Sequence, residues 1–344
     1  MRFLAIPFIS ACLIASLASA EPVTEARLLA AGNDVDNWLS YGRDYSEQRF
    51  TPLEQIDAGN VSELGMAWYF ETDTHLGLQS TPLAIDGILY FSGAWNTVYA
   101  VDGASGNMLW SFDPEVPRSK SITACCGVLN RGLAAWDDLL YIGTLDGRLI
   151  AIDRATGTLR WSAQTTDPNQ AYSITGAPRV ARGKVFIGNG GSEFGTRGFV
   201  SAYDAASGEL AWRFYTVPGN PADGFENAAM ERAAETWNGE WWKYGGGGTV
   251  WDSIVYDPEF NQLYLGVGNG APHNRRIRSP GGGDNLYLTS IVALNPDTGE
   301  YLWHYQQVPG DNWDYTASQQ MTLAEIPWEG QQRKVILHAP KAGF

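Results

Sequence analysis

Apolar residues along the chain come in short runs, and each run ends at a turn rich in Asp, Gly and small polar residues. Leu89-Tyr-Phe-Ser and Leu140-Tyr-Ile-Gly are two such runs, and a further run that carries a tryptophan follows each turn. Short strands separated by turns at even spacing predict antiparallel hairpins rather than helices. The pattern therefore predicts an all-β fold.

One turn recurs four times along the chain. Each copy has Asp or Asn, a Gly four residues later and a Trp four residues after the Gly; the tryptophans are Trp110, Trp161, Trp212 and Trp303. The Asp can bond the backbone of its own turn, and the Gly can supply a positive φ. Spacings of 51, 51 and 91 residues between the tryptophans predict four-stranded propeller blades with the rings between neighbouring blades, and an insertion in the last interval.

Composition agrees with a folded protein and limits its partners. With 44% hydrophobic and 18% charged residues, the chain has ample apolar mass for a core, which excludes a mainly disordered protein. A net charge of -15 repels nucleic acid and anionic lipid, so we expect no nucleic-acid partner. The same charge suits either a basic protein partner or simple solubility.

Residues 1–20 have the features of a secretory signal peptide. Arg2 precedes an apolar run that ends in the small-residue sequence Ala18-Ser19-Ala20, which predicts cleavage before Glu21. A lipoprotein site at Cys12 is the weaker alternative, because the apolar run before it is very short. We expect export to the periplasm, one propeller domain over residues 21–344, and no membrane span after the signal peptide.

Cys125 and Cys126 are adjacent and are the cysteines that remain after this cleavage. Neighbouring Cα atoms lie about 3.8 Å apart, below the usual disulfide range, so a bond between them would form an uncommon, strained ring. An oxidising compartment favours such a bond, and two free thiols at a strand end are the alternative. The spacing matches no zinc ligand set.

The repeated turn resembles the tryptophan docking motif of the quinoprotein dehydrogenases, which bind pyrroloquinoline quinone (PQQ) on an eight-bladed β-propeller. The resemblance implies four-stranded antiparallel blades over nearly all of residues 21–344. Four motifs and the opening of a fifth blade are present, so we expect this sequence to be about the first half of such a propeller, truncated at its C-terminal end.

Glycine-rich segments carry the candidate cation site. Gly266–Ala271 fits the dinucleotide fingerprint formally, but Pro272 and the polar stretch after it cannot open the required helix. By resemblance, Asn269 and Glu193 instead supply oxygen ligands to Ca²⁺, which suits a hard cation. The segment Trp313-Asp314-Tyr315 resembles the family's catalytic segment, which makes Asp314 the general base and a further metal contact. Lanthanide-using relatives have a second Asp where this chain has Thr316, so the resemblance favours calcium.

The resemblance also assigns the residues around the quinone. Lys341 matches a cationic residue that contacts the quinone oxygens and the catalytic carboxylate. Gln79 stands where several relatives have a Glu near the cofactor carboxylates. Arg131 suits those carboxylates through its fork of N–H donors. The complete set of expected cofactor-binding residues is Gln79, Cys125, Cys126, Arg131, Thr175, Gly191, Ser192, Thr249 and Trp251.

Together these features imply a periplasmic quinoprotein alcohol dehydrogenase that oxidises primary alcohols to aldehydes with PQQ and calcium and passes electrons to a cytochrome c. Lys341 resembles the alcohol-dehydrogenase branch, some members of which continue into a haem c domain. A cofactor-free exported scaffold of the outer-membrane assembly type and a sugar or polyol quinoprotein dehydrogenase remain alternatives. No His-Glu-x-x-His or Gly-x-Ser-x-Gly motif supports hydrolysis.

Overall fold

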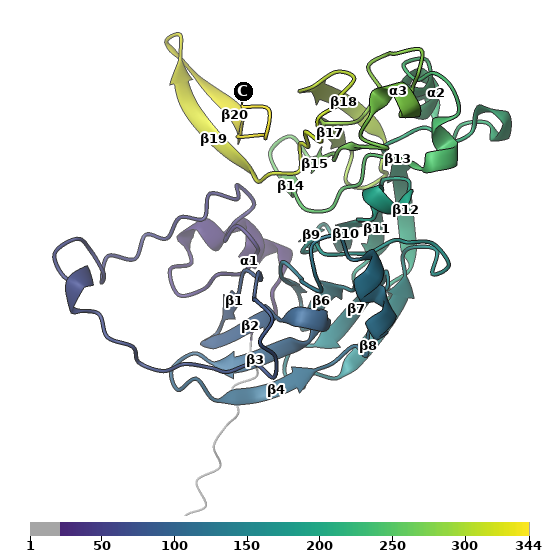
Figure 1. Cartoon of the computed structure of the whole chain (residues 1–344). Helices are drawn as coiled ribbons and strands as arrows, with labels where there is room; N and C mark the ends of the chain where they lie inside the picture. Colours follow the sequence, from purple (N-terminus) through teal and green to yellow (C-terminus); the bar gives the residue numbers. More distant parts are fainter. Residues whose placement is uncertain (1–20, 344) are drawn as a thin grey trace, which may run out of the picture.

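A computed structural model describes residues 21–343 (Figure 1). The expected signal peptide lies outside the described residues. Four antiparallel sheets, each of four strands, follow one another along the chain, and a fifth element is a two-stranded hairpin. The all-β prediction is confirmed, and the four sheets correspond to the four repeated turns.

The strands of each sheet are added in chain order, from the innermost to the outermost. The first sheet has β1 (Leu83–Ile85), β2 (Ile88–Ser92), β3 (Val98–Asp102) and β4 (Met108–Phe112); the second has β5 (Ala134–Trp136), β6 (Leu139–Gly143), β7 (Arg148–Asp153) and β8 (Leu159–Gln164). The third has β9 (Arg179–Ala181), β10 (Lys184–Gly188), β11 (Phe199–Asp204) and β12 (Leu210–Tyr215). The fourth has β14 (Ile254–Asp257), β15 (Gln262–Gly266), β17 (Ser290–Leu294) and β18 (Tyr301–Gln306), and the final hairpin pairs β19 (Met321–Trp328) with β20 (Gln331–His338).

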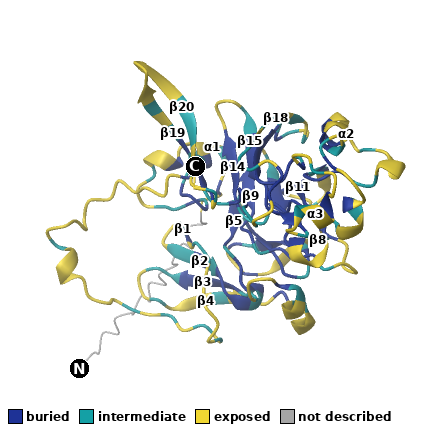
Figure 2. Ribbon diagram, turned by 45° about the horizontal axis from the view of Figure 1, so that its top comes forward, coloured by how far each residue is buried: buried dark blue, intermediate teal, exposed yellow. Residues whose placement is uncertain are grey.

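The sheets are arranged around a common axis, as the blades of a propeller (Figure 1). Among the first strands, β9 contacts both β5 and β14, and the residues of all three are largely buried. The outer strands β4 and β8 are mostly exposed (Figure 2). Apolar side chains on both faces of the inner strands therefore fill the space between sheets.

The tryptophans join neighbouring sheets, as the repeat predicts. The indole N–H of Trp110 donates to the Arg154 carbonyl of the second sheet at 3.2 Å, and Trp161 donates in the same way to Ala205 of the third at 3.1 Å. Gly157 lies directly under the Trp110 ring, because a Cβ at this position would come within 2.6 Å of it. Trp212 repeats the arrangement on the fourth sheet, donating to Pro296.

Trp68 makes the same contact with the first sheet, although it lies outside the four repeats. Its indole N–H donates to the Gly103 carbonyl at 3.1 Å, and its ring covers Gly106. Trp303 differs, because it donates to Gln262 of its own sheet. The segment that contains Trp68, residues 49–80, first loops away from the sheets and then returns to the first sheet (Figure 1). Many of its apolar side chains are exposed.

The predicted insertion lies in the fourth sheet and before it. Between β12 and β14 the chain forms α2 (Ala228–Ala234) and β13 (Gly246–Gly247); between β15 and β17 it forms β16 (Gly270–Ala271) and α3 (Arg275–Arg278). At the other end of the chain, α1 (Glu25–Leu29) begins a segment that packs against the first two sheets. No helix within residues 21–343 is long and apolar enough to cross a membrane.

Candidate active site

The topology brings two kinds of connection to one face of the propeller. In a four-stranded antiparallel sheet the strand direction alternates. The link from the second to the third strand and the link from the fourth strand to the next sheet therefore lie at the same end of the strands. The candidate residues lie in these links: Arg131 precedes β5, Glu193 lies between β10 and β11, Asn269 between β15 and β17, and Asp314 precedes β19. The repeated Asp–Gly turns lie at the opposite face.

These links enclose a cavity of about 220 Å³. Eleven of the residues expected from the sequence line it: Cys125, Cys126, Arg131, Thr175, Gly191, Glu193, Thr249, Trp251, Asn269, Asp314 and Lys341. Ser173, Gly190 and Thr316 complete the wall. Residues from six separate connections and from the chain after β20 therefore converge on one site.

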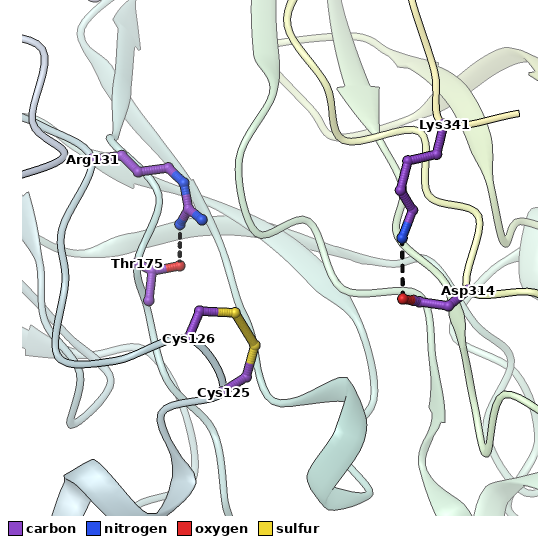
Figure 3. The surroundings of a disulfide bond; sticks show 6 residues. All are labelled: Cys125, Cys126, Arg131, Thr175, Asp314 and Lys341. Carbon is purple, nitrogen blue, oxygen red and sulfur yellow. Dashed lines mark hydrogen bonds and ion pairs between the residues drawn. A yellow bond between two sulfur atoms is a disulfide. The ribbon is translucent and has the colours of Figure 1, made fainter. Parts of the chain in front are cut away.

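Asp314 and Lys341 form an ion pair at one side of the cavity (Figure 3). Lys341 Nζ donates to Asp314 Oδ2 at 3.1 Å, and both side chains are about half exposed, at 45% and 46%. The other carboxylate oxygen, Oδ1, lies 3.7 Å from His273 Nδ1. An exposed carboxylate that is oriented in this way has the geometry to accept a proton from a bound hydroxyl group.

Arg131 forms a second polar cluster in the cavity wall (Figure 3). Its Nη1 donates to Thr175 Oγ1 at 2.6 Å, and its guanidinium carbon lies 4.8 Å from the centre of the Trp251 ring. Asp252 Oδ2 lies 3.9 Å from Arg131 Nε. Burial raises the pKa of Asp252, and the nearby Arg131 charge acts in the opposite direction. The guanidinium is thus held between an aromatic face and a buried carboxyl.

Cys125 and Cys126 are joined by a disulfide bond, the first of the two alternatives that the sequence left open. Their Cα atoms are 3.8 Å apart, and both residues are exposed at the cavity wall. The disulfide therefore presents a polarisable surface to the same space as the Trp251 ring.

The Asn269 side chain is buried and oriented by three neighbours. Its Nδ2 lies 3.3 Å from the Gly270 carbonyl, 3.4 Å from Ser192 Oγ and 3.2 Å from His273 Nδ1. The Gly270 carbonyl can only accept a hydrogen bond, so it fixes the amide nitrogen on this side. The side-chain carbonyl oxygen of Asn269 is consequently left free to bind another group.

The cation ligands expected from the sequence are two carboxylates and this amide. Glu193, Asn269 and Asp314 all line the cavity and offer only oxygen atoms, which fits a hard cation. No group of three His, Cys, Asp or Glu side chains suited to a metal occurs among residues 21–343. Oxygen ligands of this kind suit a hard cation better than a zinc ion, which prefers nitrogen and sulfur ligands.

Two expected residues lie outside the cavity wall. Gln79 is exposed in the segment before β1 and is not among the lining residues, so its role remains a prediction. Ser192 is buried behind the cavity and contacts Asn269. A contact between Ser192 and the cofactor therefore stays a prediction, as for Gln79.

Sequence reasoning missed Ser173 and His273. Ser173 precedes Thr175 by two residues, and alternate residues of an extended chain face the same side, so Thr175 could have indicated it. His273 reaches Asn269 and Asp314 only because the chain turns at Pro272. No residue spacing in the sequence marks that contact.

Known proteins resemble this chain over nearly its whole length. The PQQ family described as glucose/ethanol/alcohol dehydrogenase, beta-propeller domain, matches residues 38–344. Quinohemoprotein alcohol dehydrogenase ADH IIB of Pseudomonas putida is 60% identical over 335 residues, which cover 97% of this chain and 49% of the relative. The chain spans about half the length of the curated relatives it matches.

Solved structures also resemble the chain. Quinohemoprotein alcohol dehydrogenase ADHIIG of Pseudomonas putida HK5 is 53% identical with a TM-score of 0.91, over 93% of this chain and 47% of that one. A europium-containing methanol dehydrogenase is 33% identical with a TM-score of 0.84, over 92% and 56% of the two chains. The propeller fold is thus shared with enzymes whose names include different metals and cofactors.

Proposed function

Because this chain belongs to the PQQ-dependent glucose/ethanol/alcohol dehydrogenase β-propeller family, we propose that it is the catalytic part of a periplasmic alcohol dehydrogenase. Its substrate is a primary alcohol, its product the aldehyde, and its electron acceptor a cytochrome c. The observation that carries the proposal is the convergence of Asp314, Lys341, Glu193, Asn269 and Arg131 on one cavity.

The complete propeller has eight blades joined by tryptophan docking motifs. Four sheets and one hairpin are described here, and the chain spans about half of its relatives. Trp68 supports this arrangement, because it covers the first sheet as Trp110 and Trp161 cover the second and third. We infer that the segment around Trp68 belongs to the last blade of the closed ring.

The cavity suits a flat, anionic cofactor such as PQQ. Arg131 and Thr175 would bind its carboxylates, because a guanidinium fork forms charge-assisted bonds to carboxylate oxygens; their hydrogen bond in the cavity wall supports this role. Trp251 and the Cys125–Cys126 disulfide offer two surfaces between which an aromatic ring system can lie. Thr249, buried in the same wall, can add a hydroxyl contact.

Glu193, Asn269 and Asp314 would hold the cation, and we propose that it is calcium. The fold alone does not choose the metal, since a europium-containing enzyme shares it. Lanthanide-using relatives have one more carboxylate two residues after the catalytic Asp, and Thr316 occupies that position here. A site with fewer negative charges favours the divalent ion over a trivalent one.

Asp314 and Lys341 have separate roles in the proposed reaction. When bound, PQQ would supply the hydride acceptor and the cation would supply Lewis-acid chemistry. Asp314 Oδ1, the oxygen that Lys341 leaves free, accepts the proton of the alcohol hydroxyl. Lys341 orients the carboxylate through its hydrogen bond to Oδ2. Substrate selection among alcohols, polyols and sugars is tested by comparing rates with ethanol, glycerol and glucose.

Replacing Asp314 by Asn tests this assignment. Asp314→Asn removes the proton acceptor with little change in shape, so we expect the rate of ethanol oxidation to fall roughly 100-fold or more. The variant should still contain PQQ, which its absorbance spectrum reports. Asp223→Asn, at an exposed position far from the cavity lining, is the matched control and should keep the full rate. A PQQ-loaded Asp314→Asn enzyme with an unchanged rate would overturn the role of Asp314.

A further inference from the structure

Arg278, the last residue of α3, is a buried charge outside the cavity described above. It has the largest side chain among the fully buried residues. Burial lowers its pKa to about 10, which still leaves the guanidinium charged at neutral pH. An arginine is rarely buried in this way unless its donors are bound, so its partners indicate what it holds together.

The guanidinium bridges two separate loops. Nη1 donates to the carbonyls of Pro272 and His273, the latter at 3.1 Å, and these belong to the loop that begins at Asn269. Nη2 donates to the Asp311 carbonyl at 2.7 Å, in the loop that carries Asp314. The two loops are joined through one planar group.

Each loop is also fixed close to the guanidinium. A Cβ at Gly270 would lie 2.5 Å from Arg278, so only glycine allows this approach beside Asn269. In the other loop, Asp311 Oδ1 accepts hydrogen bonds from the backbone N–H of Trp313 at 3.0 Å and of Tyr315 at 3.3 Å. The two neighbours of Asp314 in the sequence are thus both bonded to Asp311, and Arg278 binds the carbonyl of Asp311.

A fourth partner sets the orientation of the guanidinium itself. Asn285 Oδ1 accepts from Nε at 3.3 Å and from Nη2 at 3.1 Å, and Asn285 is in turn bound to Thr236 and Ser279. A lysine ammonium carries three donors at a single point and cannot reproduce this planar fork. The geometry therefore requires arginine rather than positive charge alone.

We propose that Arg278 is a positioning residue that sets the spacing between the Asn269 amide and the Asp314 carboxylate, and thereby the affinity of the site for its cation. This inference rests on the proposed function, in which both residues bind calcium. Residues behind metal ligands commonly change metal affinity roughly 10- to 100-fold when they are replaced. Arg278 would act in this way through two backbone loops at once.

The test is the calcium affinity of Arg278→Lys, measured on the protein expressed from its whole natural gene. PQQ-loaded enzyme is stripped of metal with a chelator and titrated with Ca²⁺ in a calorimeter. We expect binding roughly 10- to 100-fold weaker than in the unmodified enzyme. An unchanged affinity in a folded variant would overturn the proposal.

Arg43→Lys is the matched control. Arg43 is also buried, at 3% exposure, and its Nη2 binds the backbone carbonyl of Asp34 at 2.9 Å, but it is not among the cavity residues. It should lose thermal stability without losing calcium affinity. A similar loss of calcium affinity in both variants would show that Arg278 acts only through general stability, against the proposal.

Failure of the variant to fold and failure of the cation site itself can each be distinguished from failure of the proposal. If Arg278→Lys does not fold, Asn285→Ser decides the question, because it removes the acceptor that orients the guanidinium while keeping the arginine. A calcium affinity unchanged in that variant would overturn the proposal. If the unmodified, PQQ-loaded enzyme itself binds no calcium, the proposed cation site fails, and this inference fails with it.

Discussion

At the scale of single residues, the repeated turns contain a natural comparison between a charged and a neutral side chain. Asp204 Oδ1 accepts from the Ser207 N–H at 2.8 Å and from the Ser207 hydroxyl at 2.9 Å. In the fourth copy, Asn295 Oδ1 accepts from Asp297 N–H at 2.8 Å and from Thr298 N–H at 3.3 Å. The turn therefore needs a hydrogen-bond acceptor at this position. The negative charge of Asp204 adds a contribution to the free energy of unfolding that depends on pH.

We predict that Asp204→Asn lowers the free energy of unfolding at pH 7 by at most about 1 kcal/mol, because the residue is exposed. The Ser207 donors lower the pKa of Asp204 in the folded protein. Its contribution is therefore complete above the unfolded pKa of about 3.9 and is lost as the pH falls through the lower, folded value. Denaturant titrations between pH 2 and 7 should show the two proteins converging at low pH.

The control for this prediction is Asp36→Asn, an exposed change that also removes one negative charge. It measures the effect of net charge alone. A difference between Asp204→Asn and the unmodified protein that does not vary with pH would contradict the role of the ionised carboxylate.

Residue types in glycine-rich contexts predicted most of the cavity. Glu193, Asn269 and Asp314 each follow a strand or a repeated motif, so a single sequence and a family resemblance were sufficient to find them. His273 and Arg278 could not be found in this way. Their contacts depend on how the insertion between β15 and β17 folds, and no periodic pattern specifies that path.

At the scale of secondary-structure elements, the tryptophan-to-glycine contact joins one sheet to the next. Gly157 has φ +71° and would place a Cβ 2.6 Å from the Trp110 ring. Gly183 has a similar φ, +69°, but nothing lies within 4 Å of its Cβ position. The two glycines therefore separate backbone strain from contact between sheets.

We predict that Gly183→Ala lowers the free energy of unfolding by about 1–2 kcal/mol, the usual penalty for an alanine in the left-handed conformation. Gly157→Ala should cost a further 1–3 kcal/mol or so, because the methyl group must displace the indole. Chemical denaturation of the two variants measures the difference. Equal losses would contradict the view that the ring holds neighbouring sheets together.

The strands were largely predictable because short apolar runs and Asp–Gly turns specify them locally. The four sheets appear at the four repeats, and the 91-residue spacing indicated the insertion correctly. Trp68 was not recognised as a partner of the first sheet, since the residues around it lack the Asp–Gly turn of the other copies. Pairing between distant segments leaves no such local signal.

At the scale of the whole molecule, the segment before the first sheet reaches the last hairpin near the propeller axis. Glu47 and Arg179 form a buried ion pair with Oε1 and Nε 2.9 Å apart, and Gln320 donates to the other Glu47 oxygen at 2.8 Å. The Ser46 carbonyl accepts from Leu323 N–H at 2.8 Å. These contacts tie together parts of the chain that are far apart in sequence.

We predict that Glu47→Gln destabilises the protein by roughly 3–5 kcal/mol, because it leaves the Arg179 charge buried without its counter-ion. Asp297→Asn breaks a more exposed pair with Arg182, 3.0 Å apart, and should cost about 0–1 kcal/mol. Thermal and denaturant unfolding of both variants test the comparison. Comparable losses would mean that the axial pair does not hold the distant segments together.

We propose that the cavity on one face of the propeller holds PQQ and a calcium ion. A crystal structure of the protein expressed from its whole natural gene and purified with its cofactors tests this most directly. We expect a planar cofactor between Trp251 and the Cys125–Cys126 disulfide, with a cation about 2.3–2.6 Å from oxygens of Glu193 and Asn269. A cofactor-loaded enzyme in which PQQ lies elsewhere, or in which those two residues do not contact the metal, would contradict it.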